Sequence, residues 1–118
     1  MKAEYKGPWL KALRSGRYEQ ALGELRMVPP NDDKPKHCCL GVLAEINDLL
    51  KADTEAGYER ALCLTPTGRL ANTSGDGLLV PSVLKLVGLT KPQQADLAEM
   101  NDNGKDFCEI ANYIEENL

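Results

Sequence analysis

The sequence has 118 residues, of which 42% are apolar and 27% charged, and its formal net charge is −4. This length suits one domain spanning residues 1–118, and the composition is globular rather than disordered. No apolar run approaches the roughly 20 residues of a transmembrane helix, and residues 1–6 lack the apolar core of a signal peptide. We therefore expect an intracellular protein without a membrane span.

The net charge conceals an uneven distribution of charge along the chain. Residues 1–36 contain eight basic and five acidic side chains, a net charge of +3. Residues 92–118 contain one basic and seven acidic side chains, a net charge of −6. Such a split is consistent with an anion-facing surface at the basic end, with two ends that dock against each other, or with solvated ends.

The first third of the chain predicts a helix, a strand and a loop. The helix begins at Pro8, where the missing N–H costs nothing, and Ser15-Gly16 ends it. Alternation over residues 23–28 favours a strand over a helix continued across residues 19–25. Residues 29–35 contain three prolines and predict an exposed loop.

The strongest helical pattern covers residues 38–51. One face of this segment carries Cys39, Val42, Leu43, Ile46 and Leu50 at helical spacing. Gly41 costs about 1 kcal/mol in a helix relative to alanine, so it indicates close packing against another segment.

Residues 57–80 change to short apolar runs separated by turn residues. Strands are expected at 58–64, at Leu70 and at 78–80. The intervening segment 72–77 is rich in glycine but lacks the lysine and the glycine spacing of a phosphate-binding loop. It is therefore predicted to be a hairpin loop.

The last third predicts three helices. Pro81 opens a short one, and Thr90 begins a second whose Gln93 completes a capping box. A glycine turn at 103–104 separates this helix from a third over residues 107–118. Together these elements predict an α+β fold, a single small domain with about four or five helices and a small antiparallel sheet.

The C-terminal helices resemble the front of a helix-turn-helix, but their charge argues against DNA binding. Phosphate contacts supply most of the affinity of a DNA-binding protein, and this segment is acidic. A packed helical hairpin is the preferred interpretation, and a nucleic-acid-binding regulator is kept as an alternative.

A calcium loop starting at Glu99 would place Ile110 at the twelfth position, where an acidic ligand is needed. Neither this segment nor the cysteine spacing predicts a metal site or a cofactor.

His37, Cys38 and Cys39 stand at the start of a predicted helix and are candidates for nucleophilic chemistry. A thiolate there would be stabilised by the helix dipole and by a protonated imidazole. Cys39 lies on the apolar face, so Cys38 is expected to be the more accessible of the two, and the cysteines as a group are expected in the core. A cysteine-dependent enzyme using Cys38 and His37 is a second alternative, although no glycine-framed nucleophile turn is present.

Three segments carry a resemblance to a known family. They are residues 9–20, the run Cys38-Cys39-Leu40-Gly41-Val42-Leu43, and residues 97–104 with 107–115. In this order they resemble small, mostly uncharacterised phage and prophage proteins over about half of the chain. The Cys-Cys-Leu-Gly-Val-Leu run is the most specific part, whereas residues 31–35 and 61–77 depart from the family pattern.

The resemblance implies a non-enzymatic phage accessory protein that acts in the host cytoplasm by binding and neutralising a host component. The partner would be a host defence protein or a small anionic nucleotide that signals for defence. Guanidinium groups pair with phosphates and aromatic rings stack on bases, so the basic beginning of the chain suits the nucleotide. The candidate ligand-binding residues are Arg14, Arg17, Tyr18, Arg26, His37 and Cys38. The sequence does not decide whether the protein forms a homo-oligomer.

Overall fold

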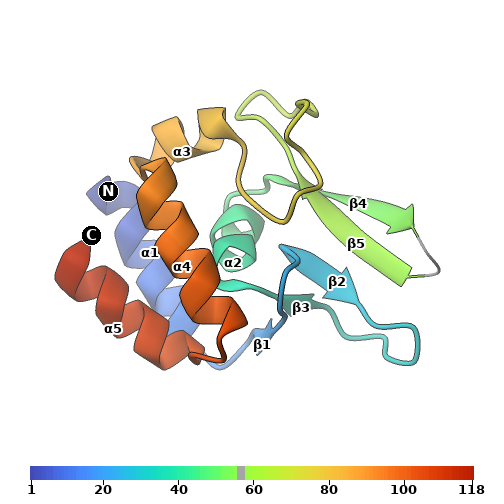
Figure 1. The fold of residues 1–118 in the computed structure, drawn as a ribbon, viewed down its shortest axis with the longest axis horizontal. Coiled ribbons are helices and arrows are strands. Elements are labelled where there is room, and N and C mark those ends of the chain that lie inside the picture. Colours follow the sequence, from blue (N-terminus) through green and yellow to red (C-terminus); the bar gives the residue numbers. More distant parts are fainter. Residues whose placement is uncertain (56–57) are drawn as a thin grey trace.

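The computed structural model describes residues 1–55 and 58–118 (Figure 1). The helices are α1 (Ala3–Arg14), α2 (Cys39–Ile46), α3 (Pro81–Val87), α4 (Lys91–Asp102) and α5 (Phe107–Asn117). The strands are β1 (Glu19–Gln20), β2 (Arg26–Val28), β3 (Lys36–His37), β4 (Leu50–Glu55) and β5 (Tyr58–Cys63). The protein is thus a small α+β domain, as the sequence predicts.

The strands form one mixed sheet in the order β1-β3-β2-β5-β4. Three of the strand pairs are antiparallel, as expected, and the longest joins β4 to β5. The exception is the edge strand β1, which runs parallel to β3 and aligns Glu19 with Lys36 and Gln20 with His37. This short pairing brings the segment after α1 beside the segment before α2.

Helix α2 is the centre of the fold. Figure 1 shows α1, α4 and α5 on one side of the molecule and β2, β4 and β5 on the other, with α2 between them. Every residue from Cys39 to Ala44 is buried, so this part of the helix is covered on all sides rather than on one. The buried Trp9 of α1 donates its indole N–H to the carbonyl oxygen of Cys39 at 2.9 Å. That hydrogen bond satisfies the one polar atom of the largest core side chain.

The close packing predicted at Gly41 is confirmed. A Cβ atom built at this position would lie 1.6 Å from the carbonyl oxygen of Leu25. The same oxygen accepts the backbone N–H of Cys38 at 3.3 Å. The backbone before β2 therefore lies directly against the first turn of α2, and only glycine leaves room for it.

Two predicted helix boundaries are wrong. Helix α1 begins at Ala3 rather than Pro8, so Pro8 lies inside the helix and cannot donate the backbone hydrogen bond that other residues there donate to the preceding turn. Helix α2 ends at Ile46 rather than at residue 51, because Asp48 adopts a left-handed backbone with φ of 56°. Leu50 fits the helical spacing of α2 but begins β4, a strand that the sequence pattern did not reveal.

The strand predictions are only partly correct. Within the predicted strand at 23–28, only Arg26–Val28 forms β2, and Leu70 forms an isolated bridge with Leu64. Residues 78–80 are not a strand. The backbone N–H of Leu79 donates to the side-chain oxygen of Gln94 at 2.8 Å and not to a neighbouring strand. Segment 72–77 therefore leads into α3 and is not a hairpin loop.

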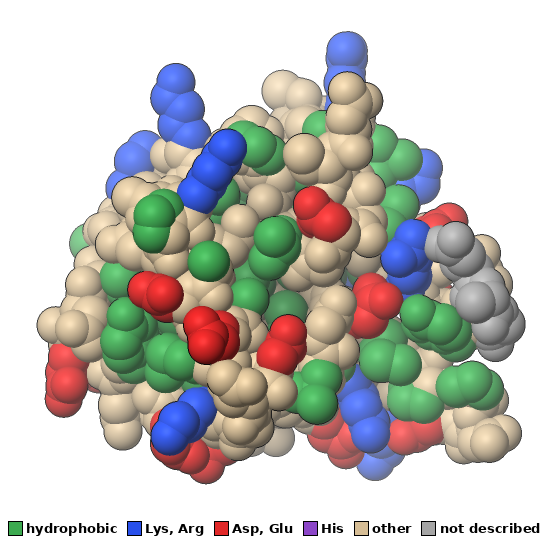
Figure 2. Space-filling model, in the orientation of Figure 1, with side chains coloured by type: hydrophobic (Ala, Val, Ile, Leu, Met, Phe, Trp, Pro, Cys, Tyr) green, Lys and Arg blue, Asp and Glu red, His purple; other side chains and the backbone are tan. Residues whose placement is uncertain are grey.

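The basic beginning and the acidic end of the chain dock against each other, one of the alternatives that the charge split left open. Arg14 of α1 lies 2.6 Å from the carboxylate of Glu115 in α5. Part of the acidic surface stays exposed: on the face in Figure 2, red side chains gather over α4, where Asp96, Glu99 and Asp102 are exposed. Within residues 1–55 and 58–118, no helix has the length and apolarity needed to cross a membrane.

Candidate functional site

A cleft with a volume of about 480 Å³ opens beside the segment that joins α1 to β1. Most of its lining residues have polar side chains, and the lining comprises Gly16, Arg17, Tyr18, Glu19, Lys34, Pro35, His37 and Glu45. We call it the polar cleft. A second hollow of about 420 Å³ adjoins it and is lined by Pro8, Lys11, Ala12, Ser15, Arg17, Tyr18 and Ile46. We call this one the apolar hollow.

The local backbone explains why Arg17 and Tyr18 stand between the two spaces. Ser15 ends α1 by donating its hydroxyl to the carbonyl oxygen of Ala12 at 2.6 Å, and its Oγ accepts the N–H of Arg17 at 3.2 Å. Gly16 then turns the chain with a φ of 75°, a left-handed conformation that favours glycine. The parallel pairing of β1 with β3 follows at once and fixes Tyr18 next to His37.

His37 forms the buried wall of the polar cleft. Its side chain is 3% exposed, and its ring meets the ring of Tyr18 edge to face, with centroids 5.1 Å apart. Nε2 lies 3.5 Å from Oε1 of Glu45, too far for a strong hydrogen bond. Neither ring nitrogen has a hydrogen-bond partner in the part of the chain that the structure describes.

The imidazole of His37 is neutral at pH 7. Burial lowers the pKa of His37 below 6.5, and this effect outweighs the nearby carboxylate of Glu45, which acts in the opposite direction. The positive charge of Arg26 adds to the lowering. His37 does line the polar cleft, but burial disfavours the protonated imidazole that the enzyme alternative requires.

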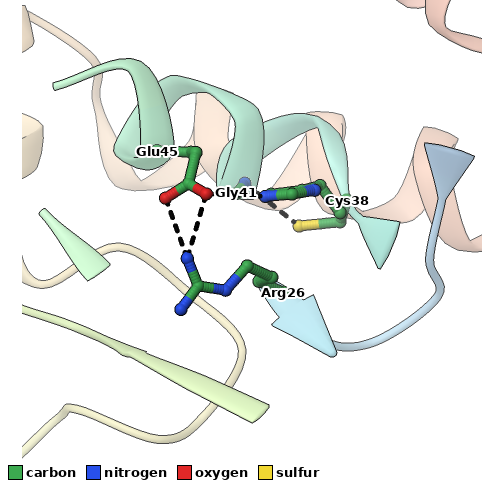
Figure 3. A network of polar contacts seen from close by, with 5 residues as sticks. Arg26, Cys38, Gly41 and Glu45 are labelled. Atoms are coloured by element: carbon green, nitrogen blue, oxygen red, sulfur yellow. Dashed lines mark hydrogen bonds and ion pairs between the residues drawn. The ribbon is translucent and has the colours of Figure 1, made fainter. Parts of the chain in front are cut away.

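Arg26 is bound to Glu45 and does not line the polar cleft. Figure 3 shows the guanidinium group of Arg26, from β2, reaching the carboxylate of Glu45 in α2. Nη1 donates to both carboxylate oxygens, at 2.9 and 3.0 Å. The side chains are 18% and 32% exposed, so the pair lies partly out of water. Arg26 thus neutralises the acidic group at the back of the cleft.

Cys38 is more exposed than Cys39, as predicted, but at 5% exposure its side chain is still buried. It caps α2, and its Sγ accepts the backbone N–H of Gly41 at 3.3 Å (Figure 3). Burial raises the pKa of Cys38 to about 11, which outweighs the stabilisation of a thiolate at the helix start. Cys39 and Cys63 are buried as expected, whereas Cys108 is exposed and not part of the core. The enzyme alternative therefore lacks a thiolate at neutral pH.

Arg14 is also engaged elsewhere. Its Nη2 donates to Oδ1 of Asn112 at 2.9 Å and pairs with Glu115, so the guanidinium faces α5. It lines a third hollow of about 340 Å³ that includes Tyr18 and Cys108. The polar cleft thus brings together Arg17, Tyr18 and His37 of the predicted set. Arg14, Arg26 and Cys38 lie outside its lining.

Five residues that line the cleft were not predicted as site residues: Gly16, Glu19, Lys34, Pro35 and Glu45. Lys34 was visible only as one of the basic side chains in residues 1–36, because the loop that carries it showed no local signal for a site. Within residues 1–55 and 58–118, no group of three or more histidine, cysteine or acidic side chains is placed so that it could hold a metal ion. The polar cleft presents two cationic side chains, two carboxylates, the imidazole of His37 and the ring of Tyr18.

Comparison with known proteins identifies a family. The family described as "Domain of unknown function (DUF8296)" matches residues 1–118. No curated protein and no solved structure matches the chain. Because the family match covers the whole sequence, this protein belongs to the DUF8296 family.

Proposed function

We propose that this protein binds a small phosphate-bearing ligand in the polar cleft and does not transform it. The observation that carries the proposal is the position of Arg17 and Lys34 in one cleft with Tyr18 and His37. Both cationic side chains are exposed, and neither forms an ion pair with a residue that the structure describes. Two free cations that converge from different segments supply charge-assisted hydrogen bonds to a phosphate group.

The charge balance of the cleft supports one phosphate group rather than a polyanion. Two carboxylates belong to its lining, those of Glu19 and Glu45. Glu45 is neutralised by Arg26, which leaves Arg17 and Lys34 against Glu19. His37 adds no charge at pH 7 because burial lowers its pKa. The excess of one positive charge matches a singly or doubly ionised phosphate ester.

We further propose that the protein is a phage accessory protein of the host cytoplasm that sequesters a nucleotide signal of host defence. This setting comes from the resemblance to phage and prophage proteins. Sequestration requires a binding site and no catalytic group, which agrees with a buried, protonated thiol at Cys38. Blocking a host defence protein is the competing form of the same role, and the experiment below separates the two.

Calorimetry with a panel of inorganic phosphate, pyrophosphate and linear and cyclic nucleotides tests the proposal. We expect one ligand to bind per chain, and we expect Arg17→Gln and Lys34→Gln each to weaken binding by roughly 10- to 100-fold, the value of a charge-assisted hydrogen bond. Arg14→Gln is the matched control, because this arginine is paired with Glu115. Chromatography of the recovered ligand is expected to show it unchanged.

Absence of heat with every compound, from protein shown to be folded by circular dichroism, would overturn the proposal and favour a protein partner. Conversion of the ligand during incubation would overturn its non-enzymatic part. Equal weakening of binding by Arg14→Gln and Arg17→Gln would mean that the polar cleft is not the site.

A further inference from the structure

The polar cleft and the apolar hollow have a common wall made by Arg17 and Tyr18. We propose that the two spaces are halves of a single site for a phosphate ester that carries a flat ring, such as a nucleotide. The phosphate lies beside Arg17 and Lys34, and the ring lies in the apolar hollow. This inference rests on the proposed function and specifies the class of ligand and its orientation.

The apolar hollow is built by one face of α1 and the end of α2. Pro8, Lys11, Ala12 and Ser15 recur at spacings of three and four residues, so they line one stripe of α1. Ile46 closes the hollow from the last turn of α2. The two helices pack against each other, so this part of the site has rigid walls.

The chemistry of this hollow selects a ring rather than a second anionic group. Pro8, Ala12 and Ile46 present carbon atoms, and the lining contains no carboxylate. A charged or polar group placed against these three side chains would lose water without gaining a hydrogen bond from them. The face of an aromatic ring packs against them at no such cost and gains contact with the half-exposed ring of Tyr18, while Lys11, Ser15 and Arg17 of the lining remain available to the polar edge of the ring.

The charges at the rim agree with this orientation. Lys11 lies on the rim of the apolar hollow and Arg17 lies between the hollow and the polar cleft. Both are exposed cations, so an anionic ligand is attracted toward both halves of the site. Each half, at about 420 and 480 Å³, is large enough by itself for a small ligand.

The test compares three probes, inorganic phosphate, a nucleoside and its 5′-monophosphate, by calorimetry on the whole chain. We expect the monophosphate to bind at least tenfold more tightly than either of the other two. Ala12→Leu, which fills the apolar hollow, is expected to weaken binding of the monophosphate about tenfold and to leave binding of inorganic phosphate unchanged. Ala3→Leu, at an exposed position in the same helix, is the control.

The possible outcomes separate this inference from the proposed function. If Ala12→Leu leaves the monophosphate affinity unchanged, or if phosphate alone binds as tightly, the two-part site is wrong while the anion site stands. If no probe binds to the wild-type chain, the proposed function itself fails. Methyl resonances of Ala12 and Ile46 in the wild-type protein give a second measurement, independent of how Ala12→Leu folds. They are expected to shift with the monophosphate and not with inorganic phosphate, and the absence of such a shift would overturn the inference.

Discussion

The side-chain oxygen of Asn101 lies 3.1 Å from the backbone nitrogen of Cys39, which joins α4 to the start of α2 across 62 residues of sequence. The amide nitrogen of Asn101 donates to the carbonyl oxygen of Ala21 at 2.7 Å. The same side-chain oxygen also accepts the amide of Gln20 at 3.0 Å. Asn101 is fully buried, so these bonds replace all of its contacts with water.

Because of these hydrogen bonds, we expect Asn101→Asp to destabilise the folded protein strongly. The change replaces a donor that faces the carbonyl oxygen of Ala21 by an acceptor and places a charge in the core. We expect a loss of about 3 kcal/mol in the free energy of unfolding. Urea denaturation followed by the fluorescence of Trp9, the single tryptophan, measures it. Asn103→Asp is the control, because Asn103 is exposed and should change stability by less than about 0.5 kcal/mol. Equal midpoints for both variants would contradict the prediction.

Two glycine-to-alanine changes are expected to affect stability to very different extents. At Gly41 the new methyl group would overlap the carbonyl oxygen of Leu25, so α2 and the backbone before β2 must separate. We expect Gly41→Ala to cost about 3 kcal/mol or more. At Gly7 in α1 nothing apart from adjacent parts of the same helix lies within 4 Å of the added atom, but the ring of the following Pro8 crowds a helical Cβ and offsets the usual gain of alanine, so Gly7→Ala should change stability by less than about 1 kcal/mol. Thermal unfolding by circular dichroism compares both with the wild type. A stable Gly41→Ala variant would show that these segments do not touch.

His37 makes stability depend on pH near neutrality. Burial lowers the pKa of His37 below its ordinary value of 6.5 in the folded chain. Between these two pKa values the unfolded chain binds a proton that the folded chain does not, so stability is full above pH 6.5 and falls as the pH drops below it. The midpoints of urea denaturation at pH 7.5 and pH 5.5 measure this decrease in stability. His37 is the single histidine, so His37→Gln should lose most of the difference. An unchanged difference in that variant would assign the titration to another group.

Thiol reactivity separates Cys108 from the other three cysteines. Cys108 is exposed, whereas Cys38, Cys39 and Cys63 are buried with raised pKa values. With a pKa of about 11, Cys38 carries on the order of one thiolate in a thousand at pH 8 even before burial slows access. We expect one thiol to react with an aromatic disulfide in the native protein and four in denaturant. Cys108→Ser should remove the native reaction, and a fast reaction that persists in this variant would show an exposed Cys38.

Local signals in the sequence predicted the helices of the last third well. The side-chain oxygen of Thr90 accepts the backbone N–H of Gln93 at 3.2 Å, and the side-chain oxygen of Gln93 accepts the backbone N–H of Thr90 at 2.9 Å. These two hydrogen bonds confirm the capping box. Both partners lie within four residues of sequence, so a short sequence pattern is enough to predict the interaction. β1 and β3 have two residues each and are defined by their pairing with other segments, β1 with β3 and β3 also with β2, so no local periodicity marks them.

From the sequence, residues of the polar cleft could be predicted only from the chemistry of their side chains. Arg17 and Tyr18 were selected because guanidinium groups pair with phosphates and aromatic rings stack on bases, and both residues line the polar cleft. Arg14 and Arg26 look equivalent to Arg17 in the sequence. In the structure, however, Arg14 forms an ion pair with Glu115 and Arg26 forms one with Glu45, and both partners come from distant segments. Lys34 was missed because its approach to Arg17 follows from the pairing of β1 with β3, which no local pattern reveals.

The contacts of Gln20 have a consequence for how this family varies. Its amide donates to Oδ1 of Asn101 at 3.0 Å and to the carbonyl oxygen of Lys105 at 2.6 Å, so the end of α4 holds the strand that positions Tyr18. The side chains that fix the shape of the polar cleft therefore differ from those that line it. We expect positions 20 and 101 to change together among members of the family, even where the ligand-contacting residues diverge.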